Sequence, residues 1–330
     1  MPPLPDPTET IDAHVHLVGM DRDATGCFLA DRMRNRVSTR WILRKVGAKR
    51  GDAPRDIDRR CVDHLREQAD LSPSVDRLVL LALDGVSDPV GNPDDSRTGM
   101  RIPNDYAFEV AAGHPKFLVG CSINPLRRDA LPELDRCAAR GAVLVKWIPA
   151  AMGFDPADPR CASFLDRLAE LGMPLLSHVG TEMAVATVSG GNGGFDRLLP
   201  ALERGVTVIL PHAGGRRLLG DEADFRRLVD ALKRHPRLHL DDSALTMFHR
   251  RRRLMRLIEE EELHDRVLHG SDYPLPVQAW AFVDRVGVRA ARSIASLPGC
   301  FERDLVLKRA LGAPDRFLGN AHRVLRLGAL

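Results

Sequence analysis

Six side chains that could bind a metal ion or move a proton stand at the ends of short apolar runs. They are His14, His16, Lys146, His178, His212 and Asp272. Imidazole nitrogens and carboxylate oxygens are donors that zinc and similar divalent ions take in proteins. A neutral histidine or an ionised aspartate can also accept a proton during catalysis. These residue types therefore indicate a metal site with acid–base chemistry, provided that the fold brings them together.

The pair His14 and His16, in "ETIDAHVHLVG", is the first of these signals. Residues i and i+2 of a β-strand point to the same face, so both imidazoles would face one side. Such a pair alone is a weak signal, because buried histidines often serve only as hydrogen-bond partners. The whole set is stronger, since burying so many polar groups without a metal would require a partner for each one.

The apolar runs that carry these residues are typical of strands buried on both faces. Eight strands are expected, over 10–18, 76–83, 116–123, 142–148, 174–179, 206–213, 238–244 and 266–272. Helix-like segments lie between them, for example over 132–141, 159–172 and 221–236. This alternation indicates parallel βαβ units. It predicts an α/β fold, a distorted (β/α)8 TIM barrel made by residues 1–330 as a single domain. An open sheet is the alternative, but no G-x-G-x-x-G motif follows the first strand.

A barrel would gather the strand ends at its C-terminal mouth, where barrel enzymes have their active sites. Two long connections, 19–75 and 84–105, follow the first two strands and would lie at this mouth. Long loops in that place commonly shape an active site. His269 stands three residues before Asp272, so the strand period places it on the opposite face, packed under a helix.

Composition narrows the class of protein. The net charge of +3, with 48 basic and 45 acidic residues, gives no reason to expect nucleic acid or an anionic membrane as partner. The six cysteines form no C-x-x-C pair and are expected to be free thiols in a reducing compartment. The start of the chain does not resemble a signal peptide, and no apolar run approaches the roughly 18 residues of a membrane helix. We expect a cytoplasmic protein with a small-molecule substrate, and a homodimer is left open.

Several phrases of the sequence resemble the amidohydrolase superfamily, and most closely its amidohydrolase-related branch, also called amidohydrolase family 2. The phrases are "IDAHVH", "VKWIPAAMGFDPADPR", "GMPLLSHVG", "VTVILPHAGG", "VLHGSDYP" and "GNAHRVL", within residues 11–325. The resemblance implies a distorted (β/α)8 barrel with a divalent metal at its mouth. Zn²⁺ is expected, with Mn²⁺ as the alternative.

The resemblance also implies roles for individual residues. His14, His16, His178 and Asp272 match the family's metal ligands, and His212 matches a residue that binds a second ion or contacts the substrate. In two-ion members the lysine matching Lys146 is carbamylated and bridges the ions. Many members of this branch use one ion, and one ion is favoured here over two.

Such a site would use metal-activated water, with Asp272 as general base, to hydrolyse an ester, lactone or amide. His212 or Lys146 would polarise the attacked carbonyl. The alternative is non-oxidative decarboxylation of an unsaturated or aromatic acid, since this branch also resembles decarboxylases. Arg217 is a candidate for binding a substrate carboxylate, unless it is a solvated residue that opens a helix. Trp147 is a candidate for lining the pocket, unless it packs in the core.

Overall fold

A computed structural model describes residues 9–49, 51–179, 194–214 and 222–328. Eight parallel strands form its centre and are hydrogen-bonded to one another in chain order. They are β1 (Ile11–His16), β3 (Arg77–Leu81), β5 (Phe117–Cys121), β6 (Leu144–Trp147), β7 (Leu175–Ser177), β8 (Val208–Leu210), β9 (Leu238–Asp241) and β10 (Val267–Leu268). All eight predicted strands are thus confirmed, with shorter bounds.

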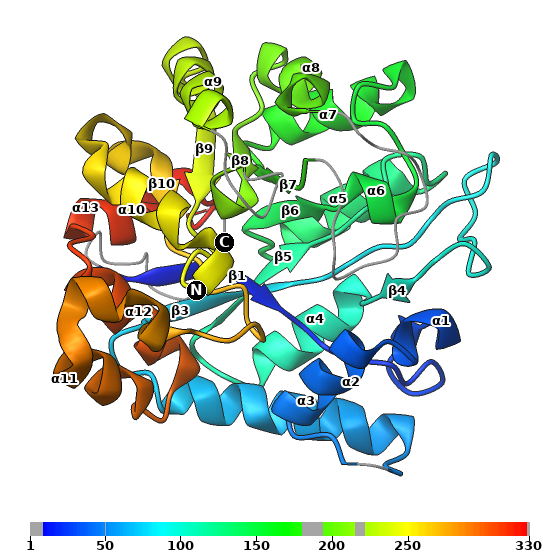
Figure 1. The fold of residues 1–330 in the computed structure, drawn as a ribbon. Coiled ribbons are helices and arrows are strands. Elements are labelled where there is room, and N and C mark those ends of the chain that lie inside the picture. The colour runs from blue at the N-terminus through cyan, green and yellow to red at the C-terminus, as the bar shows by residue number, and fades with distance from the viewer. Residues whose placement is uncertain (1–8, 50, 180–193, 215–221, 329–330) are drawn as a thin grey trace.

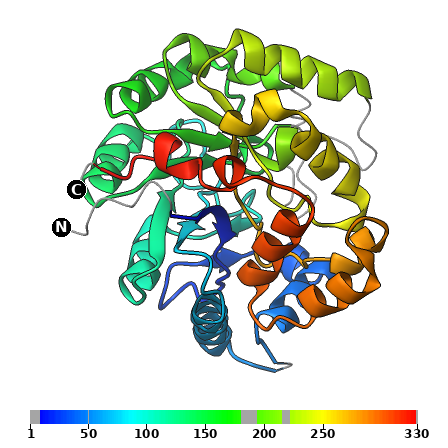
Figure 2. The ribbon, with the colours of Figure 1, turned by 90° about the vertical axis from the view of Figure 1, so that its left-hand side faces the viewer.

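Backbone hydrogen bonds between β1 and the segment after β10 close the sheet. Ala13 N donates to His269 O (2.8 Å), and Asp272 N donates to His14 O (2.9 Å). His16 N donates to Tyr273 O (2.9 Å) one step further along. The predicted (β/α)8 barrel is therefore confirmed. Helices surround the strands as a ring in Figure 2.

The barrel interior holds a small apolar core of its own. Its members include Ile11, Val79, Leu144, Leu176, Ile209 and Leu268, one or more from most strands. Ala321 of α14 (Ala321–Val324) and the following Leu325 complete this core. In Figure 2 the C-terminal segment, in red, crosses the face of the barrel that is turned to the viewer. The N-terminal end of the barrel is therefore plugged by apolar side chains.

A register shift in β1 turns the two histidines of this strand into the barrel. β1 pairs with β3, and its register moves by one residue between Asp12 and Val15. Ile11 and Ala13 belong to the interior core, whereas Val15 packs in the outer core beneath the helices. A bulge of this kind re-aims the side chains that follow it. Because of the shift, His14 and His16 take the interior positions that an unbroken alternation would give to Val15 and Leu17.

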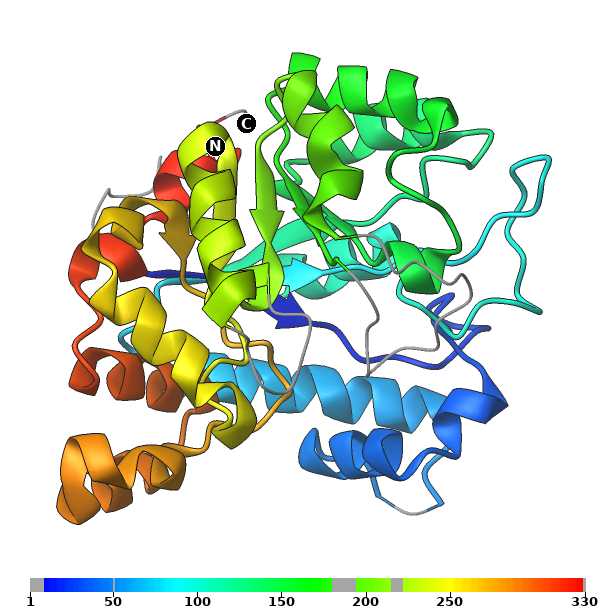
Figure 3. The ribbon, with the colours of Figure 1, turned by 45° about the horizontal axis from the view of Figure 1, so that its top comes forward.

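Both long connections predicted after the first two strands are present. The first contains β2 (Phe28–Leu29), α1 (Asp31–Arg34), α2 (Val37–Lys45) and α3 (Pro54–Asp70), and the second contains β4 (Met100–Arg101). β2 pairs antiparallel with β4, which joins the two connections to each other. α2 and α3 lie side by side on the outside of the barrel in Figures 1 and 3.

The outer helices cover the strands with a large apolar core. They are α4 (Asn104–Ala112), α5 (Ala130–Ala139), α6 (Pro149–Met152), α7 (Ala162–Glu170), α8 (Leu199–Glu203), α9 (Glu222–Arg234), α10 (Arg251–Glu259), α11 (Val283–Ala295), α12 (Cys300–Ala310) and α13 (Asp315–Leu318). The six cysteines are free, and five of them are buried. Within the described part of the chain, no helix has the length and apolar character needed to cross a membrane.

Candidate metal centre

Three of the predicted ligands form a compact triangle at the mouth of the barrel. His14 Nε2 lies 3.2 Å from His16 Nε2 and 3.5 Å from Asp272 Oδ1. His16 Nε2 lies 3.1 Å from the same carboxylate oxygen. The side chain of His14 is fully buried and that of Asp272 nearly so, whereas 25% of the His16 side chain is exposed. The triangle is therefore reached from solvent on the side of His16.

The orientation of His14 is set by Asp241, the last residue of β9. His14 Nδ1 lies 2.7 Å from Asp241 Oδ2, so a proton on Nδ1 is donated to this carboxylate. Burial lowers the pKa of His14 well below its usual value, and the charge of Lys146 lowers it further. The imidazole is thus neutral and its Nε2 carries a lone pair toward the centre of the triangle. This tautomer is the one that a metal ligand requires.

Asp272 follows β10 and takes a backbone conformation that is rare outside glycine, with φ of 63°. Its Oδ1 faces the two histidines of β1, and its Oδ2 lies 3.8 Å from His212 Nε2. Burial alone would raise the pKa of Asp272. When protonated, the surrounding imidazoles, that of His212 first, outweigh burial and hold this pKa below its ordinary value. The carboxylate is therefore ionised at neutral pH.

His212 follows β8 and also has a positive φ, of 55°. Its backbone N–H donates to Asp241 Oδ1 (2.8 Å), which holds the turn in this conformation. Its Nδ1 lies 2.9 Å from the carbonyl oxygen of Ser243, which can only accept, so Nδ1 carries a proton. In the neutral ring, Nε2 then presents its lone pair to the barrel mouth. Strained backbone at two facing residues is typical of functional sites.

Asp241 and Ser243 were not predicted from the sequence, yet they organise the centre. Asp241 accepts hydrogen bonds from His14 Nδ1, His212 N, Ser243 N and Ser243 Oγ. The available signal was the pair of aspartates that ends "LHLDD", at the same strand end as the predicted ligands. Such residues orient metal ligands through their hydrogen bonds.

His178 and Lys146 also lie at the mouth, beside the triangle. The His178 ring is 5.0 Å from that of His212 and 6.2 Å from that of His14, measured between ring centroids. Lys146 is fully buried, and its Nζ lies 3.2 Å from His14 Nε2. The structure thus brings all six predicted residues together. Among the described residues, only His14, His16 and Asp272 form a group with the spacing of ligands to one ion.

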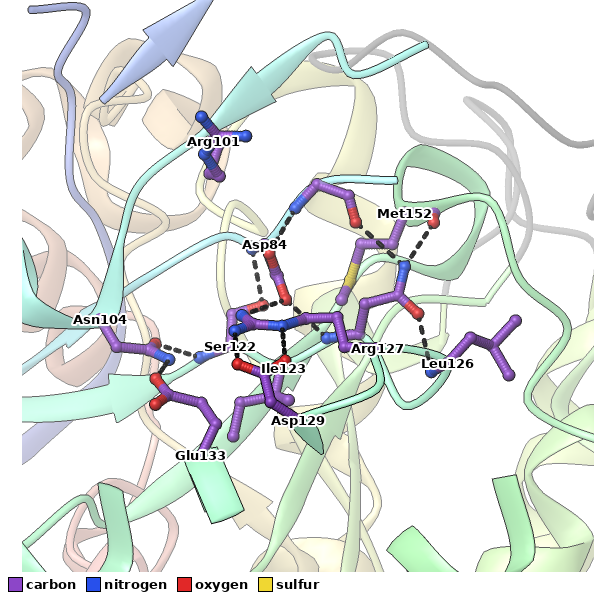
Figure 4. Close-up of polar contacts among 12 residues, drawn as sticks. Asp84, Arg101, Asn104, Ser122, Ile123, Leu126, Arg127, Asp129, Glu133 and Met152 are labelled. Atoms are coloured by element: carbon purple, nitrogen blue, oxygen red, sulfur yellow. Dashed lines mark hydrogen bonds and ion pairs between the residues drawn. The ribbon is translucent and has the colours of Figure 1, made fainter. Parts of the chain in front are cut away.

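A hydrogen-bond network on the rim fixes the strand that carries Lys146. Ser122 Oγ donates to the carbonyl oxygen of Lys146 (2.8 Å) and accepts from Asp84 N (3.0 Å). Asp84 Oδ2 accepts from Arg127 Nη1 (3.1 Å), and Ser122 N donates to Asn104 Oδ1 (2.8 Å). Figure 4 shows the contacts among Asp84, Asn104, Ser122 and Arg127. The network joins the loops after β3 and β5 to β6 and so holds the backbone of Lys146 in place.

Two further predicted residues have a different outcome. Trp147 is fully buried, donates its indole N–H to Ile123 O (2.8 Å), and packs against Phe154 and Phe164. Neighbouring residues of a strand point to opposite faces, so Lys146 faces the barrel interior and Trp147 faces the helices. The structure therefore does not bring Trp147 to the pocket. Trp147 packs in the core, which is the alternative expected for it from the sequence. Arg217 lies outside the described residues, and its role stays a prediction.

The triangle fits a divalent ion by the chemistry of its donors. Two imidazole nitrogens and a carboxylate oxygen form a set that zinc, manganese and iron all use. His14 Nε2, His16 Nε2 and the Asp272 carboxylate lie within 3.5 Å of one another, a spacing at which one ion could contact all three. The fold and the triangle together define the class: a (β/α)8 barrel with a group of residues at its mouth that could hold a metal ion.

Comparison with known proteins agrees with this class. The family model described as amidohydrolase matches residues 11–327, so the chain belongs to the amidohydrolase family. No curated protein sequence matches the chain significantly.

Solved structures share the barrel at low sequence identity. A protein from Pseudomonas putida, assigned as a 2-pyrone-4,6-dicarboxylic acid hydrolase, has 15% identity and a TM-score of 0.57, covering 96% of this chain and 97% of its own. The 5-carboxyvanillate decarboxylase of Sphingomonas paucimobilis has 16% identity and a TM-score of 0.53, covering 97% and 99%. At these identities the likeness shows a common fold, and both a hydrolase and a decarboxylase occur on it.

Proposed function

We propose that this protein is a metal-dependent hydrolase of an ester, lactone or amide bond in a small, carboxylated molecule. The observation that carries the proposal is the triangle of His14, His16 and Asp272, whose donor atoms lie within 3.5 Å of one another at the C-terminal end of the barrel strands. Membership of the amidohydrolase family supports it.

His14, His16 and Asp272 would hold one divalent ion, Zn²⁺ in the first place and Mn²⁺ as the alternative. When bound there, such an ion supplies Lewis acidity, which lowers the pKa of water and polarises a carbonyl group. His178 and His212 line the mouth beyond the triangle, where a substrate would lie. His178 as a further ligand, and a carbamylated Lys146 bridging a second ion, are alternatives to this single-ion arrangement.

Asp272 is the residue best placed to take a proton from attacking water. One of its oxygens faces the histidines of β1, while Oδ2 is turned toward His212, so the two oxygens can serve different partners. Its carboxylate is ionised because the imidazoles hold its pKa low. Because its pKa is low, Asp272 is a weak base and can accept a proton only from a water molecule whose own pKa has been lowered.

Lys146 would stabilise the oxygen of the attacked carbonyl, and His212 would do so once its Nε2 carries a proton. Ser243 O fixes the Nδ1 proton of His212, so its Nε2 is the atom available to the reacting group, 3.8 Å from Asp272 Oδ2. His212 could then receive the proton from Asp272 and pass it to the leaving group. The Lys146 amine is buried beside His14 and, as ammonium, would attract negative charge that develops on the substrate.

A carboxylated substrate is proposed because the mouth combines a buried lysine with several histidines. The proteins of similar fold are named for acids of this kind, a pyrone dicarboxylate and a carboxyvanillate. The same lysine could bind the carboxylate that is lost in a decarboxylation. Non-oxidative decarboxylation of an unsaturated or aromatic acid is therefore the second candidate, with Asp272 or His212 handling the proton.

Assaying the purified protein against carboxylated lactones, esters and amides, and separately against aromatic acids with detection of carbon dioxide, distinguishes the two candidates. Hydrolysis should fall at least about 100-fold in Asp272→Asn, the scale of losing a general base, when the variant is assayed with enough Zn²⁺ to saturate it. Asp129→Asn is the matched control, since Asp129 is half-exposed and paired with Arg127. Carbon dioxide release without hydrolysis, or full hydrolysis by Asp272→Asn, would overturn the hydrolase proposal.

A further inference from the structure

A second cluster of charged groups is buried between helix α12 and the two segments, after β9 and β10, that carry part of the metal centre. It consists of Asp242, His269, Asp304 and Lys308, whose side chains are fully buried. Asp242 follows β9, His269 follows β10, and the other two lie on α12. His269 therefore packs under a helix, as predicted, and none of these groups has a part in the proposed chemistry.

Lys308 makes contacts that join the ends of two strands. Its Nζ donates to Asp242 Oδ1 (2.8 Å) and to the carbonyl oxygen of Gly270 (2.8 Å). Gly270 N donates to the same oxygen of Asp242 (2.8 Å), which closes a three-membered network. Asp304, one turn before Lys308, contacts its Nζ at 2.5 Å and accepts from Thr246 Oγ1 (2.7 Å). One ammonium group thus ties the segment after β9 to the segment after β10.

The first of these segments holds the histidines of the metal centre. Asp242 stands between Asp241, which binds His14 Nδ1 and His212 N, and Ser243, which binds His212 Nδ1. A displacement of Asp242 would therefore move the hydrogen-bond acceptors that set both imidazole orientations.

The second segment carries the carboxylate of the metal centre. Gly270 stands two residues before Asp272 and lies against β1, so close that a Cβ on Gly270 would be 2.9 Å from the Cβ of His14. Lys308, through Gly270 O, thus fixes Asp272 relative to His14.

The charge state of the cluster agrees with this arrangement. Burial opposes the charge of Lys308, but Asp242 and Asp304 together raise the pKa of this ammonium, so it stays charged. Burial would raise the pKa of Asp242, and Lys308 outweighs it and lowers this pKa. Buried ion pairs contribute little net stability compared with apolar residues of similar volume. Their directional contacts, in contrast, restrict how the joined segments can move.

We propose that Lys308 is a positioning residue for the metal centre, which holds Asp272 and the acceptors of His14 and His212 at the spacing that one ion requires. This inference rests on the proposed function, because it presumes that His14, His16 and Asp272 bind a divalent ion.

The test is the dissociation constant for Zn²⁺, measured by competition with a chromophoric chelator, in Lys308→Met and in a matched control. Lys116→Met is the control, because Lys116 Nζ also donates to three groups, the carbonyl oxygens of Ala69, Ser72 and Val75, but before β5 at the other end of the barrel. Lys308→Met should raise the Kd about tenfold or more, the effect of losing residues that support metal ligands. Lys116→Met should leave it unchanged at a similar loss of folding stability.

A double variant, Lys308→Met with Asp242→Asn, removes one positive and one negative charge and so guards against unfolding of the single variant. It should fold and bind Zn²⁺ about tenfold more weakly or worse. A wild-type Kd in either folded variant, or an equal loss of affinity in Lys116→Met, would overturn the positioning role. Wild-type protein that binds no ion would instead overturn the proposed function, and this inference with it.

Discussion

Replacing Asp241 by asparagine should weaken metal binding while leaving the fold intact. Every contact of this carboxylate is with a donor: His14 Nδ1 on one oxygen, and His212 N, Ser243 N and Ser243 Oγ on the other. Asparagine has the same shape but presents an amide N–H₂ to one side. In one orientation this group faces the Nδ1 proton of His14, and in the other it faces two backbone N–H groups. Neither orientation preserves the native hydrogen bonds.

The size of the effect follows from the bond that is lost. To relieve the clash, His14 must move its proton from Nδ1 to Nε2, and Nε2 then no longer has the lone pair that the ion needs. A hydrogen bond to a charged group contributes about 1.5–3 kcal/mol. At about 1.4 kcal/mol per factor of ten, Asp241→Asn should raise the metal Kd roughly 10- to 150-fold.

Chelator competition with Zn²⁺ at pH 7.5 measures this change directly. Asp58→Asn is the matched control, because Asp58 on α3 is also buried and accepts from Met20 N, Asp21 N and Thr25 Oγ1, none of which belongs to the triangle. It should lower stability without changing the Kd. A folded Asp241→Asn protein with a Kd within twofold of the wild type would refute the reasoning about the His14 tautomer.

Three further predictions concern other parts of the barrel. Lys146→Met removes an amine 3.2 Å from His14 Nε2. Metal analysis and titration should show that this variant binds one ion per chain no more weakly than the wild type. If Lys146 is instead carbamylated and bridges two ions, the variant should bind one ion fewer than the wild type. Trp147→Phe leaves the carbonyl of Ile123 without its donor, and should lower the free energy of unfolding by about 1–3 kcal/mol in urea titrations with an unchanged metal Kd. Burial lowers the pKa of His239 to about 4 from 6.5. Between pH 6.5 and pH 4, His239 is protonated in the unfolded chain but not in the folded protein. The free energy of unfolding should therefore fall by up to about 3 kcal/mol as the pH drops over this range. His239→Gln should lose this part of the pH dependence.

The sequence was sufficient to predict the barrel because strand and helix alternate with clear differences in apolar pattern. It also placed the candidate ligand residues together, since parallel strands in a barrel must end at one mouth. The bulge in β1 was not foreseen, although it decides which residues face inward. A two-residue spacing puts His14 and His16 on one face, but only the register with β3 determines which face that is.

The supporting residues could not be predicted because their partners are remote in the sequence. Asp241 meets His14 across 227 positions, and Lys308 meets Asp242 across 66. Only closure of the barrel and packing of α12 decide these contacts. Trp147 is different, since alternation in β6 already sets Trp147 and Lys146 on opposite faces. Its core placement was therefore available from the same rule that grouped His14 with His16.

The most direct test of the account is to locate the ion in crystals of the metal-loaded protein by anomalous scattering at the zinc edge. We expect one strong peak per chain, within about 2.0–2.2 Å of His14 Nε2, His16 Nε2 and an oxygen of Asp272. No peak at this triangle, or a peak bound by other residues, would contradict it.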